Sequence, residues 1–299
     1  MSIILEDSTR VLVQGITGKE GRFWTEHMIE YGTNVVAGVT PGREGQYAAG
    51  VPVYHTVRRA VNDIEIDASL LFVPPRFAKD ALWEALDAGI KKVVILSDGI
   101  PLHDSLQMRK AAHSSGAMVI GGNTSGIISM GHAMMGFFPF WLDRVYKPGR
   151  IGVMTRSGSL TNEITAEIVR SGFGVSSLIG IGGDPVPLTR FAEVLPLFEE
   201  DNQTDAVVMI GELGGTMEEE VAEAIENKMF TKPLVAFFGG RTAPKGKKMG
   251  HAGAIITAGK GTVKDKIDAL NTVGAYVAER PRNVGSLLKS LLATNRIKI

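Results

Sequence analysis

The feature that most constrains the fold is an alternation between short runs of β-branched residues and segments with helical periodicity. In the first half of the chain, the apolar runs lie at 10–14, 34–39, 69–73, 92–97 and 117–121. Between two of these runs, small and apolar residues recur at helical spacing over 76–88. Strands that alternate with helices form parallel sheets with crossover helices. The pattern therefore predicts an α/β fold.

An aromatic segment marked by glycine and proline interrupts this alternation between Gly131 and Gly149. The pattern then starts again, with apolar runs at 150–155, 174–181, 205–210 and 232–237. Two such arrays predict two doubly wound domains, each a parallel sheet in a three-layer arrangement. We expect the domains at 1–125 and 150–299, with a linker segment at 126–149.

Two helix starts are marked in the second half. Thr216 and Glu219 have the spacing of a capping box, in which the two side chains cap each other's backbone N–H groups. Ser157-Gly158-Ser159 follows an expected strand and precedes a periodic segment that begins at Leu160. Both patterns predict helix N-termini.

Composition excludes several classes of protein. The 32 Lys+Arg and 32 Asp+Glu residues cancel, which argues against a nucleic-acid surface. The absence of cysteine excludes disulfides and thiolate metal sites, and it fits a reducing compartment. No apolar run approaches the ~18–20 residues that cross a bilayer, and no cationic-then-apolar leader precedes the first strand. We expect a cytoplasmic protein that binds neither nucleic acid nor membrane.

A glycine-rich turn from Gln14 to Gly21 follows the first expected strand and opens a helix. Its G-x-x-G-x-x-G pattern is a loose relative of the dinucleotide fingerprint, and its free N–H groups could hold a phosphate. The second strand ends at Val39-Thr40-Pro41-Gly42-Arg43, where a nicotinamide site would place an acid. Arg43 favours a phosphorylated ribose, as in NADP or coenzyme A, but a solvent-exposed turn arginine fits this position equally well.

Several other turns lie at the carboxyl ends of expected strands, where open α/β sheets place ligands. They are Ser97-Asp98-Gly99, Gly122 to Gly126, Thr155 to Ser159, Gly182 to Pro185 and Gly211 to Gly215.

His251 differs from the other five histidines because Gly250 and Ala252 flank it in a loop after Lys245-Gly246-Lys247-Lys248. Small neighbours leave a ring open to close approach. A lone loop histidine is nevertheless more often structural than catalytic, and an acid such as Glu212 is more often a cap or a surface group. The residues alone leave both interpretations open.

Known catalytic motifs are missing. Neither Lys19 nor Lys247 has the glycine spacing and the Ser/Thr of a P-loop, so a nucleoside triphosphate must bind elsewhere. There is no H-E-x-x-H, no G-x-S-x-G and no metal-ligand cluster, and we expect no metal site in this chain.

Taken together, the motifs resemble the α subunit of succinate–CoA ligase from about residue 3 to 293. They are Gly15-Ile16-Thr17-Gly18, Gly38 to Gly42, Ser157-Gly158, Gly180 to Pro185, Gly211 to Gly215 and Thr242 to Ile256. The resemblance implies a Rossmann-like CoA-binding domain followed by a flavodoxin-like ligase domain. It also implies a β subunit with an ATP-grasp site that holds ATP or GTP with Mg, in a heterodimer or heterotetramer.

The resemblance further implies that the chain transfers a phosphoryl group through a histidine, as in the succinyl-CoA reaction of the tricarboxylic acid cycle. His251 takes a phosphoryl group from the nucleotide and passes it to a small carboxylic acid, and CoA displaces phosphate to give succinyl-CoA. Glu212 matches the acid that holds the histidine ring, and Ser157, Gly158 and Ser159 match the helix start that stabilises the phosphoryl group. The implied CoA contacts are Thr17, Gly18, Lys19, Glu20, Arg43, Ser97, Asp98 and Gly99.

The chain departs from the family pattern at some positions. The family usually has Lys at Arg43, Tyr at Asn162 and Cys-Pro at Thr124-Ser125. Asn162, Asn123 and Thr124 are expected near the reacting acid, where together with Tyr146-Lys147-Pro148-Gly149 they look more like ATP-citrate lyase and citryl-CoA synthetases. Malyl-CoA or citryl-CoA formation is therefore an alternative to succinyl-CoA formation.

Two other classes stay open at this stage. A nicotinamide-dependent oxidoreductase is disfavoured because no ribose-binding acid follows Val39. A non-catalytic acyl-CoA-binding protein would need only residues 1–125 and would leave His251 unexplained.

Overall fold

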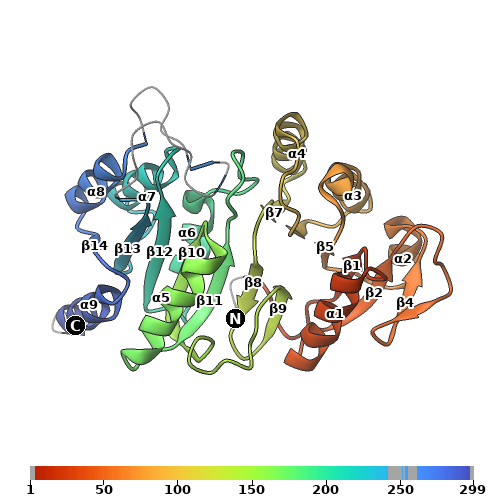
Figure 1. Ribbon diagram of the computed structural model, residues 1–299, viewed down its shortest axis with the longest axis horizontal. Helices are drawn as coiled ribbons and strands as arrows, with labels where there is room; N and C mark the ends of the chain where they lie inside the picture. Colours follow the sequence, from red (N-terminus) through yellow and green to blue (C-terminus); the bar gives the residue numbers. More distant parts are fainter. Residues whose placement is uncertain (1–3, 242–250, 252, 255–260, 297–299) are drawn as a thin grey trace. The chain divides into compact units, whose positions relative to one another are not determined.

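The computed structural model describes residues 4–241, 251, 253–254 and 261–296. Two compact units divide the chain. The N-terminal unit comprises Leu5–Phe138 and Val186–Thr189, and the C-terminal unit comprises Pro139–Pro185 and the chain from Arg190 onward, with Ile4. Figure 1 labels the helices and strands of both units.

A seven-stranded sheet in the order β3-β4-β2-β1-β5-β6-β7 forms the centre of the N-terminal unit. Its strands are β1 (Val11–Gln14), β2 (Val35–Val39), β3 (Tyr47–Ala48), β4 (Val51–Tyr54), β5 (Ala68–Leu71), β6 (Lys92–Ile95) and β7 (Met118–Gly121). Neighbours are parallel except β3, which runs antiparallel to β4. The predicted parallel sheet is confirmed, with an antiparallel edge that the sequence pattern does not show.

The helices of this unit are α1 (Lys19–Tyr31), α2 (Val57–Asp63), α3 (Pro75–Asp87) and α4 (Leu102–Ser115). Helices α2, α3 and α4 pack in series, whereas α1 packs against β9. Strands β8 (Gly126–Ser129) and β9 (Ala133–Gly136) form an antiparallel hairpin within the segment expected as a linker. The Thr33 hydroxyl donates to the Met134 carbonyl at 2.9 Å and accepts from the Met134 N–H at 2.9 Å, which ties this hairpin to the end of α1.

Five parallel strands in the order β14-β13-β12-β10-β11 form the sheet of the C-terminal unit. They are β10 (Pro148–Thr155), β11 (Val175–Gly180), β12 (Ala206–Glu212), β13 (Leu234–Gly239) and β14 (Tyr276–Ala278). The helices are α5 (Gly158–Arg170), α6 (Phe191–Glu200), α7 (Met217–Glu226), α8 (Val263–Thr272) and α9 (Asn283–Arg296). Helix α5 packs with α9, while α6, α7 and α8 pack in series.

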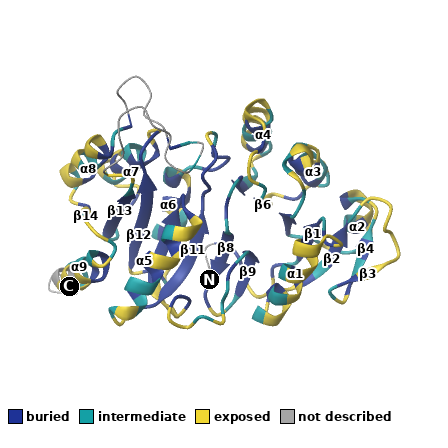
Figure 2. Cartoon of the chain, in the orientation of Figure 1, coloured by how far each residue is buried: buried dark blue, intermediate teal, exposed yellow. Residues whose placement is uncertain are grey.

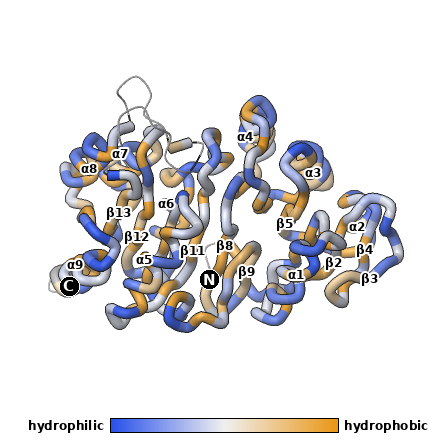
Figure 3. The backbone as a smooth tube through the Cα atoms, viewed as in Figure 1, coloured by the Kyte–Doolittle hydropathy of each residue, from blue (hydrophilic) through white to orange (hydrophobic). Residues whose placement is uncertain are grey.

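Several strands of the two sheets are buried along their whole length. Every residue of β1, β11 and β12 is buried, and Figure 2 shows the strands dark while the outer helix faces are exposed. Parallel strands that are covered on both faces have continuous runs of apolar residues. Figure 3 shows this pattern along β12 and β13. This burial explains why these strands could be predicted from short runs of sequence. None of the described helices is long and apolar enough to span a bilayer.

The two predicted helix starts differ in outcome. Ser157 is the N-cap of α5, and its hydroxyl accepts from the Leu160 N–H at 3.4 Å, which confirms that start. Thr216 also precedes a helix, α7, but the prediction that Thr216 and Glu219 form a capping box is wrong. Its hydroxyl donates to Glu220 at 3.0 Å, and Glu219 binds the ammonium group of Lys266 at 2.9 Å. Competing side-chain partners have replaced the reciprocal cap.

Candidate active site

His251 lies beside the carboxyl end of β12, where Glu212 is the last residue of the strand. Its Nδ1 atom is 2.7 Å from Oε2 of Glu212. The Glu212 side chain is 9% exposed and that of His251 is 26% exposed, so the contact is largely shielded from water. A carboxylate can only accept, so Nδ1 of His251 carries the proton in this contact.

The turn after β11 supports one face of the His251 ring. A Cβ atom added to Gly183 would lie 2.5 Å from Cγ of His251 and 2.7 Å from Nδ1. The Gly253 N–H donates to the Gly183 carbonyl at 3.2 Å, which joins the chain after the histidine to this turn. The predicted Gly182 to Pro185 turn is thus a surface against which the imidazole packs.

Arg156 is a third charged residue of this site and was not predicted. It follows β10 directly, is 4% exposed, and places Nη2 3.1 Å from Oε1 of Glu212. Glu212 therefore contacts a histidine with one oxygen and an arginine with the other. The sequence shows only an arginine among small polar residues after a strand, a pattern that an exposed turn arginine shares.

A pocket of about 270 Å³ opens in front of these groups. Its lining joins Glu212 and His251 to the start of α5, with Ser157, Ser159 and Leu160. The Ser157 N–H donates to the Thr155 hydroxyl at 3.0 Å, which holds the turn before the helix. The structure thus brings together His251, Glu212 and the predicted phosphate-binding turn, and the N-terminal end of α5 favours an anion there.

Asn162 is exposed on the second turn of α5 and accepts a hydrogen bond from the hydroxyl of Tyr146. Tyr146 is 6% exposed, and burial raises the pKa of its phenol above the ordinary value, so the phenol stays protonated and donates. An accepting Oδ1 turns the Asn162 amide so that its NH₂ group is directed away from Tyr146. The aromatic segment before β10 thus orients the side chain that departs from the family pattern.

The glycine-rich turn of the N-terminal unit packs closely on the helix that it opens. A Cβ atom on Gly21 would lie 2.4 Å from the Gly15 carbonyl oxygen, so α1 starts against the backbone of the turn. The Gly15 N–H donates to the Val39 carbonyl at 2.8 Å, and the Thr17 hydroxyl donates to that of Thr40 at 3.1 Å. The expected contacts after β1 therefore lie beside the turn after β2. Thr17, Gly18, Lys19 and Glu20 are all exposed.

Arg43 lies in that second turn and is exposed. Its backbone N–H donates to the Thr40 carbonyl at 3.1 Å, and the Gly42 N–H donates to Nδ1 of His55 at 2.8 Å. These bonds hold the backbone while the guanidinium group extends into solvent. An exposed turn arginine without a ligand has the same arrangement.

The other two turns of this unit also meet. The Asn123 N–H donates to the Ser97 carbonyl at 2.7 Å, and the Ser97 hydroxyl donates to the Val73 carbonyl at 2.5 Å. Asp98 and Gly99 are exposed, and Thr124 is buried and accepts from the Gly126 N–H at 3.0 Å. Asn123 and Thr124 belong to the N-terminal unit, whereas Asn162 belongs to the C-terminal unit.

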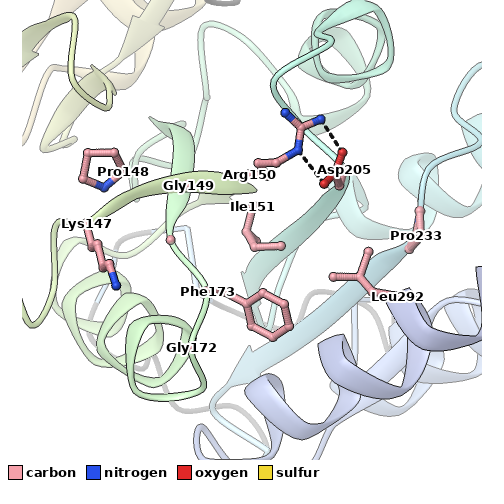
Figure 4. A pocket seen from close by; sticks show the side chains of 11 residues that line it. Lys147, Pro148, Gly149, Arg150, Ile151, Gly172, Phe173, Asp205, Pro233 and Leu292 are labelled. Carbon is pink, nitrogen blue, oxygen red and sulfur yellow. Dashed lines mark hydrogen bonds and ion pairs between the residues drawn. The ribbon is translucent and has the colours of Figure 1, made fainter. Parts of the chain in front are cut away.

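Part of the expected loop around His251 lies outside the described residues, namely 242–250, Ala252 and 255–260. A larger pocket, of about 520 Å³, lies at the amino ends of β10 and β11 (Figure 4), at the opposite edge of the sheet from Glu212. Phe173, Ile151 and Leu292 line it beside the Arg150–Asp205 ion pair. Its described lining includes no predicted site residue.

Two family models match the chain. A CoA binding domain matches residues 6–99, and a CoA-ligase domain matches residues 154–276. The solved ATP citrate lyase of Methanothrix soehngenii, in complex with citrate and coenzyme A, has a TM-score of 0.90 at 26% identity over 99% of this chain. This chain spans 52% of the length of that lyase chain.

Curated relatives match over nearly the whole sequence. An ADP-forming sulfoacetate–CoA ligase subunit of Bilophila wadsworthia is 68% identical over 98% of this chain and 100% of its own length. A sulfoacetate–CoA ligase subunit of an Acholeplasma species is 65% identical over 98% of this chain and 99% of its own. A succinate–CoA ligase α subunit of Archaeoglobus fulgidus is 49% identical over 98% and 100%. The chain belongs to the family of α subunits of ADP-forming acid–CoA ligases.

Proposed function

We propose that this chain forms sulfoacetyl-CoA from sulfoacetate, CoA and ATP through a phosphohistidine at His251. The observation that carries the relay is the 2.7 Å contact between Nδ1 of His251 and Glu212, at a pocket that the start of α5 also lines. The choice of acid rests on two relatives at 68% and 65% identity that are named for sulfoacetate, against 49% for one named for succinate.

The first step is attack by Nε2 of His251 on the terminal phosphorus of ATP, which releases ADP. The ring becomes cationic as the N–P bond forms, and the carboxylate of Glu212 stabilises that charge through Nδ1–H. Arg156 balances the charge of Glu212 from the other side at 3.1 Å. Arg156 and the ring that becomes cationic therefore contact the two oxygens of Glu212, which keeps its carboxylate in place during the step.

Two displacements then complete the reaction. The sulfoacetate carboxylate takes the phosphoryl group from His251 and becomes an acyl phosphate. The CoA thiol next attacks the acyl carbon and phosphate leaves. The first N–H groups of α5, at Gly158 and Ser159, would stabilise the transferred charge.

For CoA we propose the exposed residues around the turns of the N-terminal unit, with Arg43 on a phosphate and Thr17 to Glu20 beside α1. The match of residues 6–99 to the CoA binding domain supports this assignment. We also propose a β subunit of ATP-grasp type that holds the nucleotide with Mg, in an αβ or (αβ)₂ assembly. The relatives named as subunits of ADP-forming ligases support a partner chain.

The test is to co-express the chain with its β-type partner and to measure CoA-dependent ADP and GDP release with sulfoacetate, succinate, malate and citrate. We expect the highest kcat/KM with sulfoacetate, and labelled ATP should put phosphate on His251 of this chain. Turnover that persists in His251→Asn, or labelling of another residue, would remove the relay. Equal or higher kcat/KM with another acid would remove the sulfoacetate assignment and leave the relay intact.

Succinate or citrate is the second candidate. The succinate–CoA ligase relatives and the ATP citrate lyase structure favour it. The short amide of Asn162 and the Thr124-Ser125 pair offer space and hydrogen-bonding groups to a larger acid, if they line the acyl site as the family pattern implies. If the native chain is active with citrate and Asn162→Tyr is not, this second candidate is supported. If the native chain has no activity with citrate, the citrate candidate is rejected.

A further inference from the structure

A buried ionic cluster lies beneath the turn that follows Glu212. Lys266 of α8 and Glu218 of α7 form an ion pair in which both side chains are 0% exposed. The Lys266 ammonium also donates to Oε2 of Glu219 at 2.9 Å and to the Gly215 carbonyl at 3.0 Å. Neither Lys266 nor Glu218 lines the pocket in front of His251, within the described part of the chain.

The cluster connects to the site through the main chain of β12. While Oε2 of Glu218 binds Lys266, its Oε1 accepts from the backbone N–H of Glu212 at 3.2 Å. Glu218 also packs on the neighbouring strand residue, because a Cβ atom on Gly211 would lie 2.6 Å from Oε1. One carboxylate thus holds both the ammonium and the main chain of the residue that orients His251.

Such a cluster is costly to bury, and an apolar pair of similar volume commonly stabilises a fold at least as well. Tying α7 to α8 does not by itself require charge. What an apolar pair cannot supply is an acceptor for the Glu212 N–H, and a buried N–H without an acceptor is unfavourable. The Glu212 carboxylate must in turn lie within a few tenths of an ångström of its place to hold Nδ1 of His251.

We propose that Lys266 and Glu218 are positioning residues for the Glu212–His251 pair. Lys266 fixes the rotamer of Glu218, Glu218 fixes the main chain at Glu212, and Glu212 then meets the imidazole at 2.7 Å. The inference rests on the proposed phosphohistidine only for its kinetic consequence, since the hydrogen bond between Glu212 and His251 can be observed without any phosphorylation.

Two double variants separate positioning from packing. Lys266→Met with Glu218→Gln removes both charges and keeps an amide oxygen as acceptor for the Glu212 N–H. Lys266→Met with Glu218→Met removes both charges and the acceptor. Neither double leaves an unpaired buried charge, so both should fold, and the Met/Met double should unfold at a somewhat lower temperature because the Glu212 N–H has lost its acceptor. Glu219→Gln is the matched control, because it perturbs the Lys266 ammonium but does not touch the Glu212 main chain.

The readouts are the rate of His251 labelling by ATP in the assembled enzyme and the Nδ1–H signal of His251 in ¹⁵N-resolved NMR of the chain. We expect Glu219→Gln to label within about threefold of the native rate. The Met/Gln double should be slower by about threefold to tenfold, because position 218 keeps its acceptor but loses the ammonium group that fixes its rotamer. The Met/Met double should be slower by about tenfold to a hundredfold, with an altered Nδ1–H signal, because small displacements at a reacting group have effects of this size.

Equal labelling rates and equal Nδ1–H signals in the two doubles would overturn the proposal and leave the cluster as a tie between α7 and α8. If the native enzyme is not labelled on His251 while the signals of the doubles differ, the proposed relay fails and the positioning role stands. Hydrogen exchange of the Glu212 amide in the native chain needs no variant. The proposal requires slow exchange like that of the β12 core, and rapid exchange would reject it.

Discussion

The two units present the charged groups of their proposed sites in opposite ways. In the C-terminal unit, Arg156 and Glu212 are 4% and 7% exposed and already touch. In the N-terminal unit, Lys19 and Arg43 are exposed at the ends of turns whose backbone alone is fixed. A group that makes and breaks bonds needs its geometry before the substrate arrives, whereas a cation that meets a phosphate can adjust to the ligand. The difference between the units is thus one between prearranged and adaptable charge.

Removal of the nucleophile should have the largest effect. His251→Asn keeps a polar side chain of similar reach but has no nucleophilic nitrogen, so label from ATP and acyl-CoA formation should both fall to background. CoA binding by isothermal titration should be unchanged, because the CoA binding domain covers residues 6–99. A variant that loses CoA affinity along with labelling would show that the two units are not independent in this respect.

A matched pair of arginine substitutions compares the two kinds of charge directly. Arg156→Met leaves the buried carboxylate of Glu212 with one partner fewer, and we expect it to lower the free energy of unfolding by about 3–5 kcal/mol. Arg43→Met changes an exposed side chain, and we expect a change within about 0.5 kcal/mol. Urea unfolding of both variants measures the difference. Similar values for the two would mean that the buried contact stabilises nothing.

Reversal of the exposed charge should affect binding and not folding. Arg43→Glu places a carboxylate where a CoA phosphate is expected, so affinity for CoA should fall by about tenfold or more at low ionic strength, and by less as salt is added. Lys110→Glu, an equal change of charge on the second half of α4, is the control. Unchanged CoA affinity in Arg43→Glu would remove this residue from the proposed site.

The smallest predicted effect concerns a partly exposed ion pair. The Arg10 side chain lowers the pKa of Asp67 to about 2 from an ordinary value of 3.8, mainly through a hydrogen bond. A lowered pKa in the folded state stabilises the fold above the unfolded value and loses that effect as the pH falls through the folded one. Asp67→Asn should therefore unfold at a slightly lower temperature than the native chain at pH 7. The difference between the two unfolding temperatures should disappear as the pH falls from 4 to 2. A difference in unfolding temperature that persists at pH 2 would show that the substitution acts through packing and not through the charge.

The sequence predicts the architecture well for strands that are buried on both faces, because such strands have continuous runs of apolar residues. All nine strands expected from such runs are present, from β1 to β13. The short strands β3, β4 and β14 and the β8–β9 hairpin are not predicted. Their residues are few, and the position of the hairpin beside α1 depends on contacts such as that between Thr33 and Met134, which are 101 residues apart along the chain. Local patterns cannot record such contacts.

The site is predictable only in part for a similar reason. His251 and Glu212 are singled out by a specific motif, and the fold brings them to 2.7 Å although 39 positions separate them. Arg156 and the Lys266–Glu218 pair were missed, because burial of a charged residue depends on which partner reaches it. The Thr216–Glu219 pattern failed because Glu220 and Lys266, which the pattern does not include, compete for the same atoms.

The packing of His251 against Gly183 has a consequence for attempts to diversify this enzyme. Because the imidazole occupies the space that any Cβ atom at position 183 would need, every substitution there, even alanine, must displace the ring. Libraries that randomise the turn after β11 to broaden acid choice should yield active clones in which this position is glycine and the others vary. Any active clone with alanine at position 183 would show that the ring can move without loss of activity.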